Sequence, residues 1–343
     1  MIVTVWLSGE NHRLARAELT GAARRLGGRE VEPSVVVGVP GRATVELPDQ
    51  AAAIQLASRL ALAHRCAKAW PEMDLEGLES GLNDAGGAHS PAAFQWVSGS
   101  AGTRPPEILR RLGAAYQAGG GRISLNHSAR RFWVEPTPGD RIRLFEEVGV
   151  VDRPSFSARR TPKLPFQRPV TLAPRLARAL VNLARVGPGD RVVDPFVGTG
   201  SLLLEAALVG ARTVGVDASA TMVRGALENF AHLGQTPEML RQADAADAAA
   251  EFPREAFDAL VTDPPYGRAS GTRGEDPERL WSRALVAWSE RVRLGGRLAI
   301  VVPAGSEVPR FDARLEQVIP QRVHRSLTRE FRVYVREPVS LAG

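Results

Sequence analysis

The chain has 343 residues, 44% of them hydrophobic, and a formal net charge of +6 at pH 7. This length exceeds that of an ordinary single core and predicts two domains. Cys66 is the only cysteine, which excludes an intramolecular disulfide and a cysteine-based zinc site and favours a reducing compartment. The N-terminal apolar run is too short for a signal peptide, and no run of about 18 apolar residues could span a membrane. We therefore expect a cytoplasmic, monomeric protein that needs no metal.

Positive charge is concentrated in two segments. Residues 1–150 hold 17 basic and 16 acidic side chains, whereas residues 151–191 hold 9 basic and 2 acidic ones. A second cluster, residues 322–336, contains five arginines against Glu330 alone. Concentrated positive charge suits an anionic polymer, because each neutralised phosphate releases counterions. Nucleic acid is therefore the expected partner, and a solvated basic face is the alternative.

The N-terminal half predicts an α+β region. Its first part has the pattern strand, helix, two strands, helix, over residues 2–7, 11–28, 34–39, 42–47 and 50–69. The Gly-, Ala- and Ser-rich residues 77–104 predict a loop, and a helix is expected near residues 106–118. The string GGGRISLNHSARRFWVEP then predicts two short strands around a turn at residues 126–129.

The C-terminal half predicts an α/β fold. Residues 151–168 lack periodicity and contain several prolines, as expected of a linker, and residues 172–186 form a clear helical pattern. Beyond them strands and helices alternate strictly, which predicts a doubly wound, mostly parallel sheet with ligands at the carboxyl ends of its strands. The predicted strands cover residues 191–196, 211–217, 238–244, 257–263 and 296–303, and the helices 201–209, 220–232 and 277–293. The resulting domains are residues 1–150, a linker 151–171, and 172–343.

Three carboxylates follow consecutive strands of this pattern. Asp194 ends a strand just before the glycine turn of Gly198 and Gly200, where the backbone can approach a ligand closely. Leu203 occupies the third position of the dinucleotide fingerprint, so pyrophosphate is disfavoured. Asp217 ends the next strand and can accept both hydroxyls of a ribose. Asp244 ends the one after that and can accept from an adenine amino group. Together they predict an adenosine-containing ligand.

The string LVTDPPYGRAS raises a separate question, because Pro264 and Pro265 must end the strand that precedes them. One interpretation is a simple strand terminator followed by a turn. The other is a rigid segment that holds the carboxylate of Asp263 and a backbone carbonyl toward an amino group, with Tyr266 as a stacking surface.

These motifs resemble the S-adenosylmethionine-dependent methyltransferases with a Rossmann-like catalytic domain, and DPPY is similar to their amino-methylating signature. Across roughly residues 155–335, the strings VVDPFVGTGSLLLEAALVGA, VGVD, TDPPYGR and HRSLTREFRVYV are similar to the tRNA guanosine N2-methyltransferases that act at tRNA position 10. RISLNHSARRFWVE resembles part of a THUMP domain, the RNA-binding module that those enzymes carry.

The resemblance implies a role for each candidate residue. Asp194 and the backbone of Phe196, Gly198, Thr199 and Gly200 would hold the methionine part of S-adenosylmethionine. Asp217 would hold the ribose and Asp244 the adenine. Asp263 and the Pro264 carbonyl would accept from the guanine amine, and Tyr266 would stack on the flipped base. The predicted contacts to tRNA are Arg159, Arg160, Lys163, Arg268, Arg130 and Arg131.

Several alternatives stay open at this point. DNA adenine-N6 methyltransferases use the same Asp-Pro-Pro-Tyr loop, although the basic linker and the THUMP-like strands favour RNA. Enzymes acting on tRNA position 6 or on rRNA share the architecture. A protein-glutamine methyltransferase would not explain the arginine clusters. A non-catalytic RNA-binding protein would have no use for the intact Gly198, Gly200, Asp217 and Asp263.

Overall fold

The computed structural model describes residues 1–31, 41–86, 90–97, 105–126, 129–137, 141–160, 163–169, 171–266 and 276–337. The chain divides into two compact units. The first comprises residues 1–6, 30–58 and 64–150, and the second comprises residues 7–29, 59–63 and 151–343. The predicted N-terminal domain, residues 1–150, is therefore distributed over both units.

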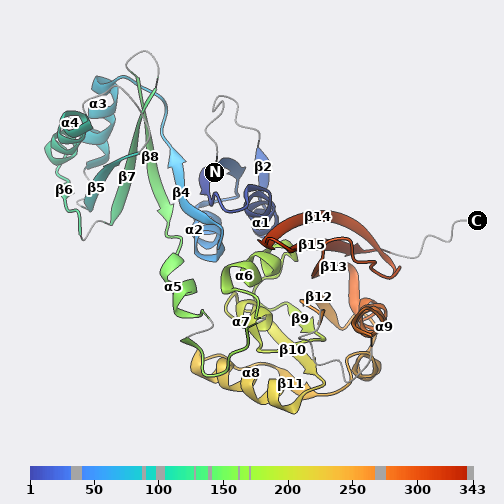
Figure 1. Ribbon diagram of the computed structural model, residues 1–343. Coiled ribbons are helices and arrows are strands. Elements are labelled where there is room, and N and C mark those ends of the chain that lie inside the picture. The colour runs from blue at the N-terminus through green and yellow to red at the C-terminus, as the bar shows by residue number, and fades with distance from the viewer. Residues whose placement is uncertain are drawn as a thin grey trace, which may run out of the picture. The chain divides into compact units, whose positions relative to one another are not determined.

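The first unit is built around an eight-stranded sheet with the strand order β2-β3-β1-β4-β8-β7-β5-β6 (Figure 1). Its strands are β1 (Ile2–Leu7), β2 (Arg29–Val31), β3 (Arg42–Glu46), β4 (Ala63–Ala69), β5 (Pro91–Trp96), β6 (Arg122–Ile123), β7 (Arg130–Thr137) and β8 (Arg141–Gly149). Its helices are α2 (Gln50–Arg59), α3 (Leu75–Gly86) and α4 (Pro105–Ala118). Phe94, Tyr116 and Phe132 are buried together in the core that α3 and α4 form with the sheet.

Two predictions for this region are wrong. The helix expected over residues 50–69 ends at Arg59, and Ala63–Ala69 is instead strand β4, because pairing with β8 outweighs helical propensity. Residues 77–104 include most of α3 and the whole of β5. The two strands expected on either side of residues 126–129 are β6 and β7, and both pair in parallel with β5, which lies between them. The strand predicted at residues 34–39 lies outside the described residues.

The second unit contains a seven-stranded sheet with the order β11-β10-β9-β12-β13-β15-β14. Its strands are β9 (Arg191–Asp194), β10 (Arg212–Asp217), β11 (Met239–Gln242), β12 (Phe257–Thr262), β13 (Val292–Pro303), β14 (Ala313–His324) and β15 (Leu327–Arg336). The first five in spatial order are parallel, and β15 is antiparallel to both β13 and β14. This confirms the predicted doubly wound, mostly parallel sheet.

Three helices connect the parallel strands: α7 (Ser201–Ala207), α8 (Ala220–His232) and α9 (Pro277–Ser289). The other helices of this unit precede β9 in the chain: α1 (His12–Arg25), α5 (Arg153–Ala158) and α6 (Pro174–Leu183). The chain steps one way from β9 to β11 and the other way from β12 to β13, so right-handed crossovers place α7 and α9 on opposite faces of the sheet (Figure 1). Trp281 and Trp288 of α9 are buried against the sheet. None of the described helices meets the length and apolarity needed to cross a membrane.

Helix α1 belongs to the second unit because it packs on α6. A Cβ atom at Gly21 would lie 2.4 Å from the backbone oxygen of Asn182, so only glycine permits this approach. The buried carboxylate of Glu18 accepts hydrogen bonds from the backbone N–H groups of Ala61 and Leu62, both at 2.8 Å, and from Asn182 Nδ2 at 2.9 Å. Burial raises the pKa of Glu18 despite these hydrogen bonds.

Candidate active site

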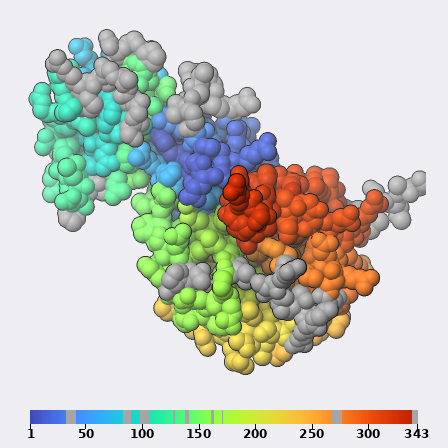
Figure 2. Space-filling model, in the orientation of Figure 1, coloured from blue at the N-terminus to red at the C-terminus, as the bar shows by residue number. Residues whose placement is uncertain are grey.

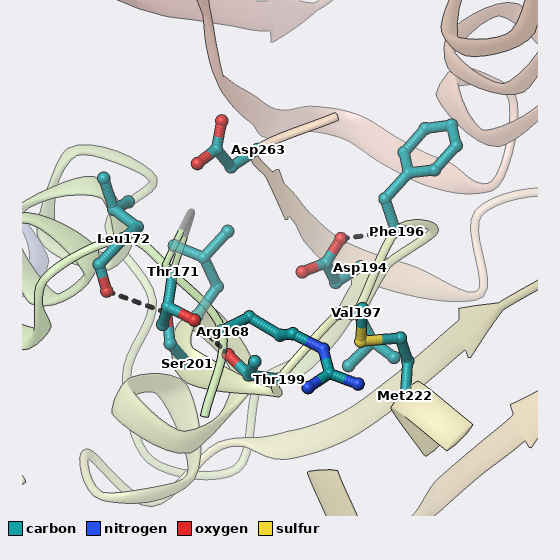
Figure 3. Close-up of a pocket in the computed structure, with 12 residues that line it drawn as sticks. Arg168, Thr171, Leu172, Asp194, Phe196, Val197, Thr199, Ser201, Met222 and Asp263 are labelled. Carbon is teal, nitrogen blue, oxygen red and sulfur yellow. Dashed lines mark hydrogen bonds between the residues drawn. The ribbon is translucent and has the colours of Figure 1, made fainter. Parts of the chain in front are cut away.

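A cavity of about 110 Å³ lies at the carboxyl ends of β9 and β12. Its wall comes from the segment before α6, the end of β9 with its glycine turn, the start of α7, helix α8 and the end of β12. Figure 3 shows the carboxylates of Asp194 and Asp263 and the guanidinium of Arg168 around it. The lining residues are Arg168, Thr171, Leu172, Asp194, Phe196, Val197, Gly198, Thr199, Ser201, Leu202, Met222 and Asp263.

The glycine turn is held in place by Asp217. Gly198 and Gly200 both have left-handed backbones, with φ of +51° and +84°, which side chains rarely adopt. At the end of β10, the Asp217 carboxylate accepts from the N–H of Gly198 at 3.0 Å and from the N–H of Ser219 at 2.8 Å. Asp217 thus ties the turn to the neighbouring strand, and it lies outside the lining of the cavity.

Asp194 links β9 to β12 beneath the cavity. Its Oδ1 accepts a hydrogen bond from the Phe196 N–H at 2.9 Å and another from Thr262 Oγ1 at 2.7 Å. Burial raises the pKa of Asp194 to about 7, against the effect of these two bonds, and the nearby carboxylates of Asp263 and Asp217 raise it further. Asp194 is therefore a buried acid whose ionised form is disfavoured by its surroundings.

Asp263 places a buried acceptor at the cavity. It directly follows β12, and its Oδ1 is buried without a hydrogen-bond partner among the described residues. Its Oδ2 lies 3.9 Å from Nη1 of Arg329. Burial raises the pKa of Asp263 to about 6, and Arg329 and Tyr266 oppose this rise. A buried acceptor of this kind fits a ligand that brings its own N–H donor.

Tyr266 lies next to the same arginine. The guanidinium carbon of Arg329 is 5.4 Å from the centre of the Tyr266 ring. Burial raises the pKa of the phenol, as does the carboxylate of Asp263. The conformation of the loop beyond Tyr266, including the predicted RNA contact Arg268, lies outside the described residues. Pro264 is buried between Asp263 and the second proline of the motif.

Asp244 lies at the expected strand end but away from the cavity lining. Its Oδ1 accepts from the N–H groups of Ala246 at 2.9 Å and Asp247 at 3.1 Å, and Arg283 lies 3.4 Å from its Oδ2. Burial, which would raise the pKa of Asp244, is outweighed by these backbone bonds and by Arg283, so its pKa is lowered. Asp194, Asp217 and Asp244 nevertheless follow the adjacent strands β9, β10 and β11 along one edge of the sheet.

The structure separates the predicted RNA contacts of the linker. Arg159 donates to both oxygens of the buried Glu205 carboxylate, at 2.9 and 3.3 Å, and its side chain is only 12% exposed. Arg159 is thus an ion-pair partner of Glu205 and is less accessible than the other predicted contacts of the linker. In contrast, Arg160 and Lys163 are exposed and make no ion pair with any described residue. They line a groove of about 710 Å³ together with Arg153, Arg175 and Glu10.

In the first unit, the two predicted RNA contacts of β7 differ in the same way. Arg130 is paired with Glu146 at 2.7 Å and its guanidinium lies over the Phe132 ring. Arg131 is 45% exposed and lies 3.7 Å from Glu147. Arg131 is therefore the more accessible of the two cations.

The basic cluster of residues 322–336 is not one continuous basic face. Strands β14 and β15 form part of the outer surface of the second unit (red in Figure 2). Arg322 and Arg325 are exposed there. The buried Arg336 donates to the carbonyls of Ser289 and Val292, and Arg332 is paired with Glu330. The nucleic-acid surface expected from this cluster is therefore reduced to two side chains.

Sequence reasoning missed several residues of the site. Arg329 was counted only as surface charge, since no local pattern shows that an antiparallel strand brings it to Asp263. Arg168, Thr171 and Leu172 line the cavity from the end of the predicted linker and the residue that follows it, and their place before a helix carries no distinguishing sequence signal. Among the described residues, no group of three His, Cys, Asp or Glu side chains could hold a metal ion.

Comparison with known proteins places this site in a family. Residues 162–330 match the family described as RMKL-like, methyltransferase domain. A tRNA (guanine(10)-N2)-dimethyltransferase of Methanothermobacter thermautotrophicus is 39% identical over 202 residues, which cover 57% of this chain and 59% of that protein. The chain thus spans about three fifths of that relative's length.

Two further comparisons extend this result. A probable tRNA (guanine(10)-N2)-dimethyltransferase of Methanothermococcus thermolithotrophicus is 31% identical, and the match covers 47% of this chain and 97% of that protein. The crystal structure of TrmN from Thermus thermophilus shares the fold, with a TM-score of 0.50 and 22% identity over 98% of this chain and 100% of that one. Because the match covers nearly the whole of the Methanothermococcus protein, the chain belongs to the same family as that probable tRNA (guanine(10)-N2)-dimethyltransferase.

Proposed function

We propose that the protein transfers a methyl group from S-adenosylmethionine to the exocyclic N2 amine of the guanosine at position 10 of tRNA. The observation that carries this proposal is the buried, unpaired Oδ1 of Asp263, which lines the same cavity as the glycine turn. The names of the relatives support the choice of tRNA and of position 10.

The residues at the cavity fit S-adenosylmethionine, which supplies a methyl group bound to a cationic sulfur. Two carboxylates, Asp194 and Asp263, line the cavity and suit a cationic ligand, and Arg168 offers a partner for a carboxylate. The left-handed Gly198 allows the backbone to approach closely. Asp217 and Asp244 follow the next two strands along the same edge, where the ribose and adenine of the donor would bind.

Asp263 would act on the methyl acceptor, which is the guanine N2 amine. The guanine N2 amine is a poor nucleophile because its lone pair is delocalised into the ring. Two acceptors, the Asp263 carboxylate and the Pro264 carbonyl, would hold both N–H groups and turn the lone pair toward the methyl group. The nitrogen must lose a proton as it gains the methyl group, and Asp263 Oδ1 would accept that proton and release it to water.

Positioning accounts for most of the expected acceleration. Well-oriented partners gain roughly 7–11 kcal/mol from proximity. The Tyr266 ring would stack on the flipped guanine, a contact of roughly 1–3 kcal/mol that offsets part of the cost of unstacking. Because Arg329 lies against this ring, the stacking surface is held from the side of β15.

The function is tested by incubating the full-length protein with radiolabelled methyl donor and a tRNA transcript, then mapping the modified nucleotide by mass spectrometry. We expect N2-methylguanosine at position 10 and no label in a transcript in which that guanosine is replaced by adenosine. Label at position 6, or in rRNA, would redirect the specificity within the family. Label in adenine of duplex DNA, or no transfer to any nucleic acid, would refute the proposal.

Charge reversal of Arg160 and Lys163 together is expected to weaken tRNA binding and to flatten its salt dependence, without changing donor affinity. Both side chains are exposed in the groove beside the segment that leads to the cavity. Each lost phosphate contact should reduce the log-log salt slope by about 0.7–0.9. Filter binding at several salt concentrations measures both quantities.

Arg212 provides the matched control for this experiment. Its side chain is 63% exposed, and it begins β10 at the edge of the sheet opposite the cavity. Reversal of its charge should leave the salt slope unchanged. Equal slopes for the wild type and the Arg160/Lys163 variant would show that this groove makes no phosphate contact.

A further inference from the structure

Arg329 is the cation that contacts both functional side chains of the Asp-Pro-Pro-Tyr segment. It lies near the start of β15 and pairs with Pro303 of β13 and Gln321 of β14. From there its Nη1 lies 3.9 Å from Asp263 Oδ2, and its guanidinium carbon lies 5.4 Å from the centre of the Tyr266 ring. One side chain thus touches the proposed amine acceptor and the proposed stacking surface.

Arg329 is also mostly buried, which sets it apart from the exposed arginines of its cluster. Its side chain is only 14% exposed, whereas Arg322 and Arg325 of the same basic cluster are exposed. Its Nε is buried without a hydrogen-bond partner among the described residues, and its ion pair with Asp263 is longer than a hydrogen bond. Burying a guanidinium in such an arrangement is poor support for stability, which favours a role in the site.

We propose that Arg329 is a positioning residue for methyl transfer, which keeps the Asp263 carboxylate ionised and the Tyr266 ring in place for the guanine. This inference rests on the proposed function, because it acts through the residues assigned there to the amine and the base.

The charged groups around Asp263 show how this works. Asp263 faces Arg329 from β15, Tyr266 from the following loop and Asp194 from β9. Burial raises the pKa of Asp263 from 3.8 to about 6, and Arg329 is the main group that opposes the rise. A protonated Asp263 could not accept the hydrogen bond of the amine or the proton that leaves it. Without Arg329, the pKa of Asp263 should be higher, so that Asp263 would be protonated at neutral pH as well.

The main test is the pH profile of kcat/KM for tRNA methylation by the full-length protein. In this profile, kcat/KM falls at low pH as Asp263 becomes protonated. For Arg329→Gln we expect this acidic limb to shift to higher pH by about one unit, since an adjacent arginine lowers a carboxyl pKa by roughly 1–3 units. Arg329→Lys keeps the charge and should keep the position of the limb, with a higher KM because the planar contact with Tyr266 is lost.

Arg332 supplies a matched control, because it lies on the same strand, is also 14% exposed and is paired with a different carboxylate, Glu330. Arg332→Gln should leave the limb where it is in the wild type. A uniform loss of rate in Arg329→Gln with an unmoved limb, or an equal movement in Arg332→Gln, would overturn the proposal.

A second readout does not depend on activity. The pKa of Asp263 is higher in the folded protein than in the unfolded chain. Its contribution to the free energy of unfolding therefore falls as the pH rises from about 4 to about 6, and it stays constant above pH 6. Arg329→Gln should extend the fall in Tm to higher pH, and adding Asp263→Asn to both backgrounds should remove the difference between them. Because Asp263 also raises the pKa of Asp194, each Arg329→Gln variant is compared only with the parent that has the same residue at position 263.

The two readouts separate the possible failures. If the wild type methylates no tRNA but the Tm profiles show the coupling of Arg329 with Asp263, the proposed function fails and the electrostatic role of Arg329 stands without it. If tRNA is methylated but Arg329→Gln changes the pH dependence of Tm by the same amount with and without the Asp263→Asn substitution, the role of Arg329 is refuted.

Discussion

Asp263→Ala is expected to reduce methyl transfer by a factor on the order of 10²–10⁴, the range typical for loss of a positioned acid–base group. The reason is that Oδ1 of Asp263, which lines the cavity, is buried and has no hydrogen-bond partner among the described residues. Radiolabel transfer to tRNA at saturating donor measures the effect. Asp263→Asn should be similarly impaired, because it keeps the shape but loses the charge and the capacity to accept the proton.

Donor affinity should hardly change in these Asp263 variants, because the carboxylate acts on the amine. Asp217→Ala should behave in the opposite way. It removes the acceptor for the N–H groups of Gly198 and Ser219, which loosens the glycine turn on which the donor would bind. Titration calorimetry with the methyl donor distinguishes the two. Equal losses of donor affinity in both variants would show that this division of roles is wrong.

A fragment of residues 151–343 is expected not to fold into a stable catalytic unit. Helix α1 and residues 59–63 belong to that unit and are missing from the fragment. Their loss uncovers the part of α6 on which α1 packs and removes the buried apolar side chains of α1, such as Leu14 and Leu19. Burial of one such side chain contributes roughly 1.5–3 kcal/mol, against a typical domain stability of about 5–15 kcal/mol. Urea unfolding of the fragment and of the full chain measures this difference.

The same contact can be tested in the full chain. Glu18→Ala should lower the free energy of unfolding by at least about 3 kcal/mol, because three buried donors lose their acceptor. Glu10→Ala is the control, since Glu10 is 69% exposed and its pair with Arg175 should contribute about 0–1 kcal/mol. A fragment that unfolds with the same midpoint as the full chain would contradict the assignment of α1 to the catalytic unit.

This result also changes how the contribution of the N-terminal half to tRNA choice must be measured. A comparison of residues 151–343 with the full chain would mix loss of RNA contacts with loss of the α1 packing. Variants of the exposed Arg131 in the intact chain avoid that problem.

Local patterns alone determined the α/β class, the glycine turn and the acid that follows each strand. Alternation of apolar strands with helices, and prolines directly after a strand, are signals carried by neighbouring residues, so Asp194, Asp217 and Asp263 could be identified from their places in the sequence.

Tertiary structure alone decided which charged groups are paired. Arg159 and Arg160 are adjacent in the chain, yet one is paired with the buried Glu205 and the other is exposed. Arg329 reaches Asp263 only because an antiparallel strand pairs with β13. Helix α1 joins the catalytic unit through a contact between Glu18 and Asn182, 164 residues apart along the chain. Such pairings depend on sheet order and helix packing between distant segments, which local propensity and charge counts do not specify.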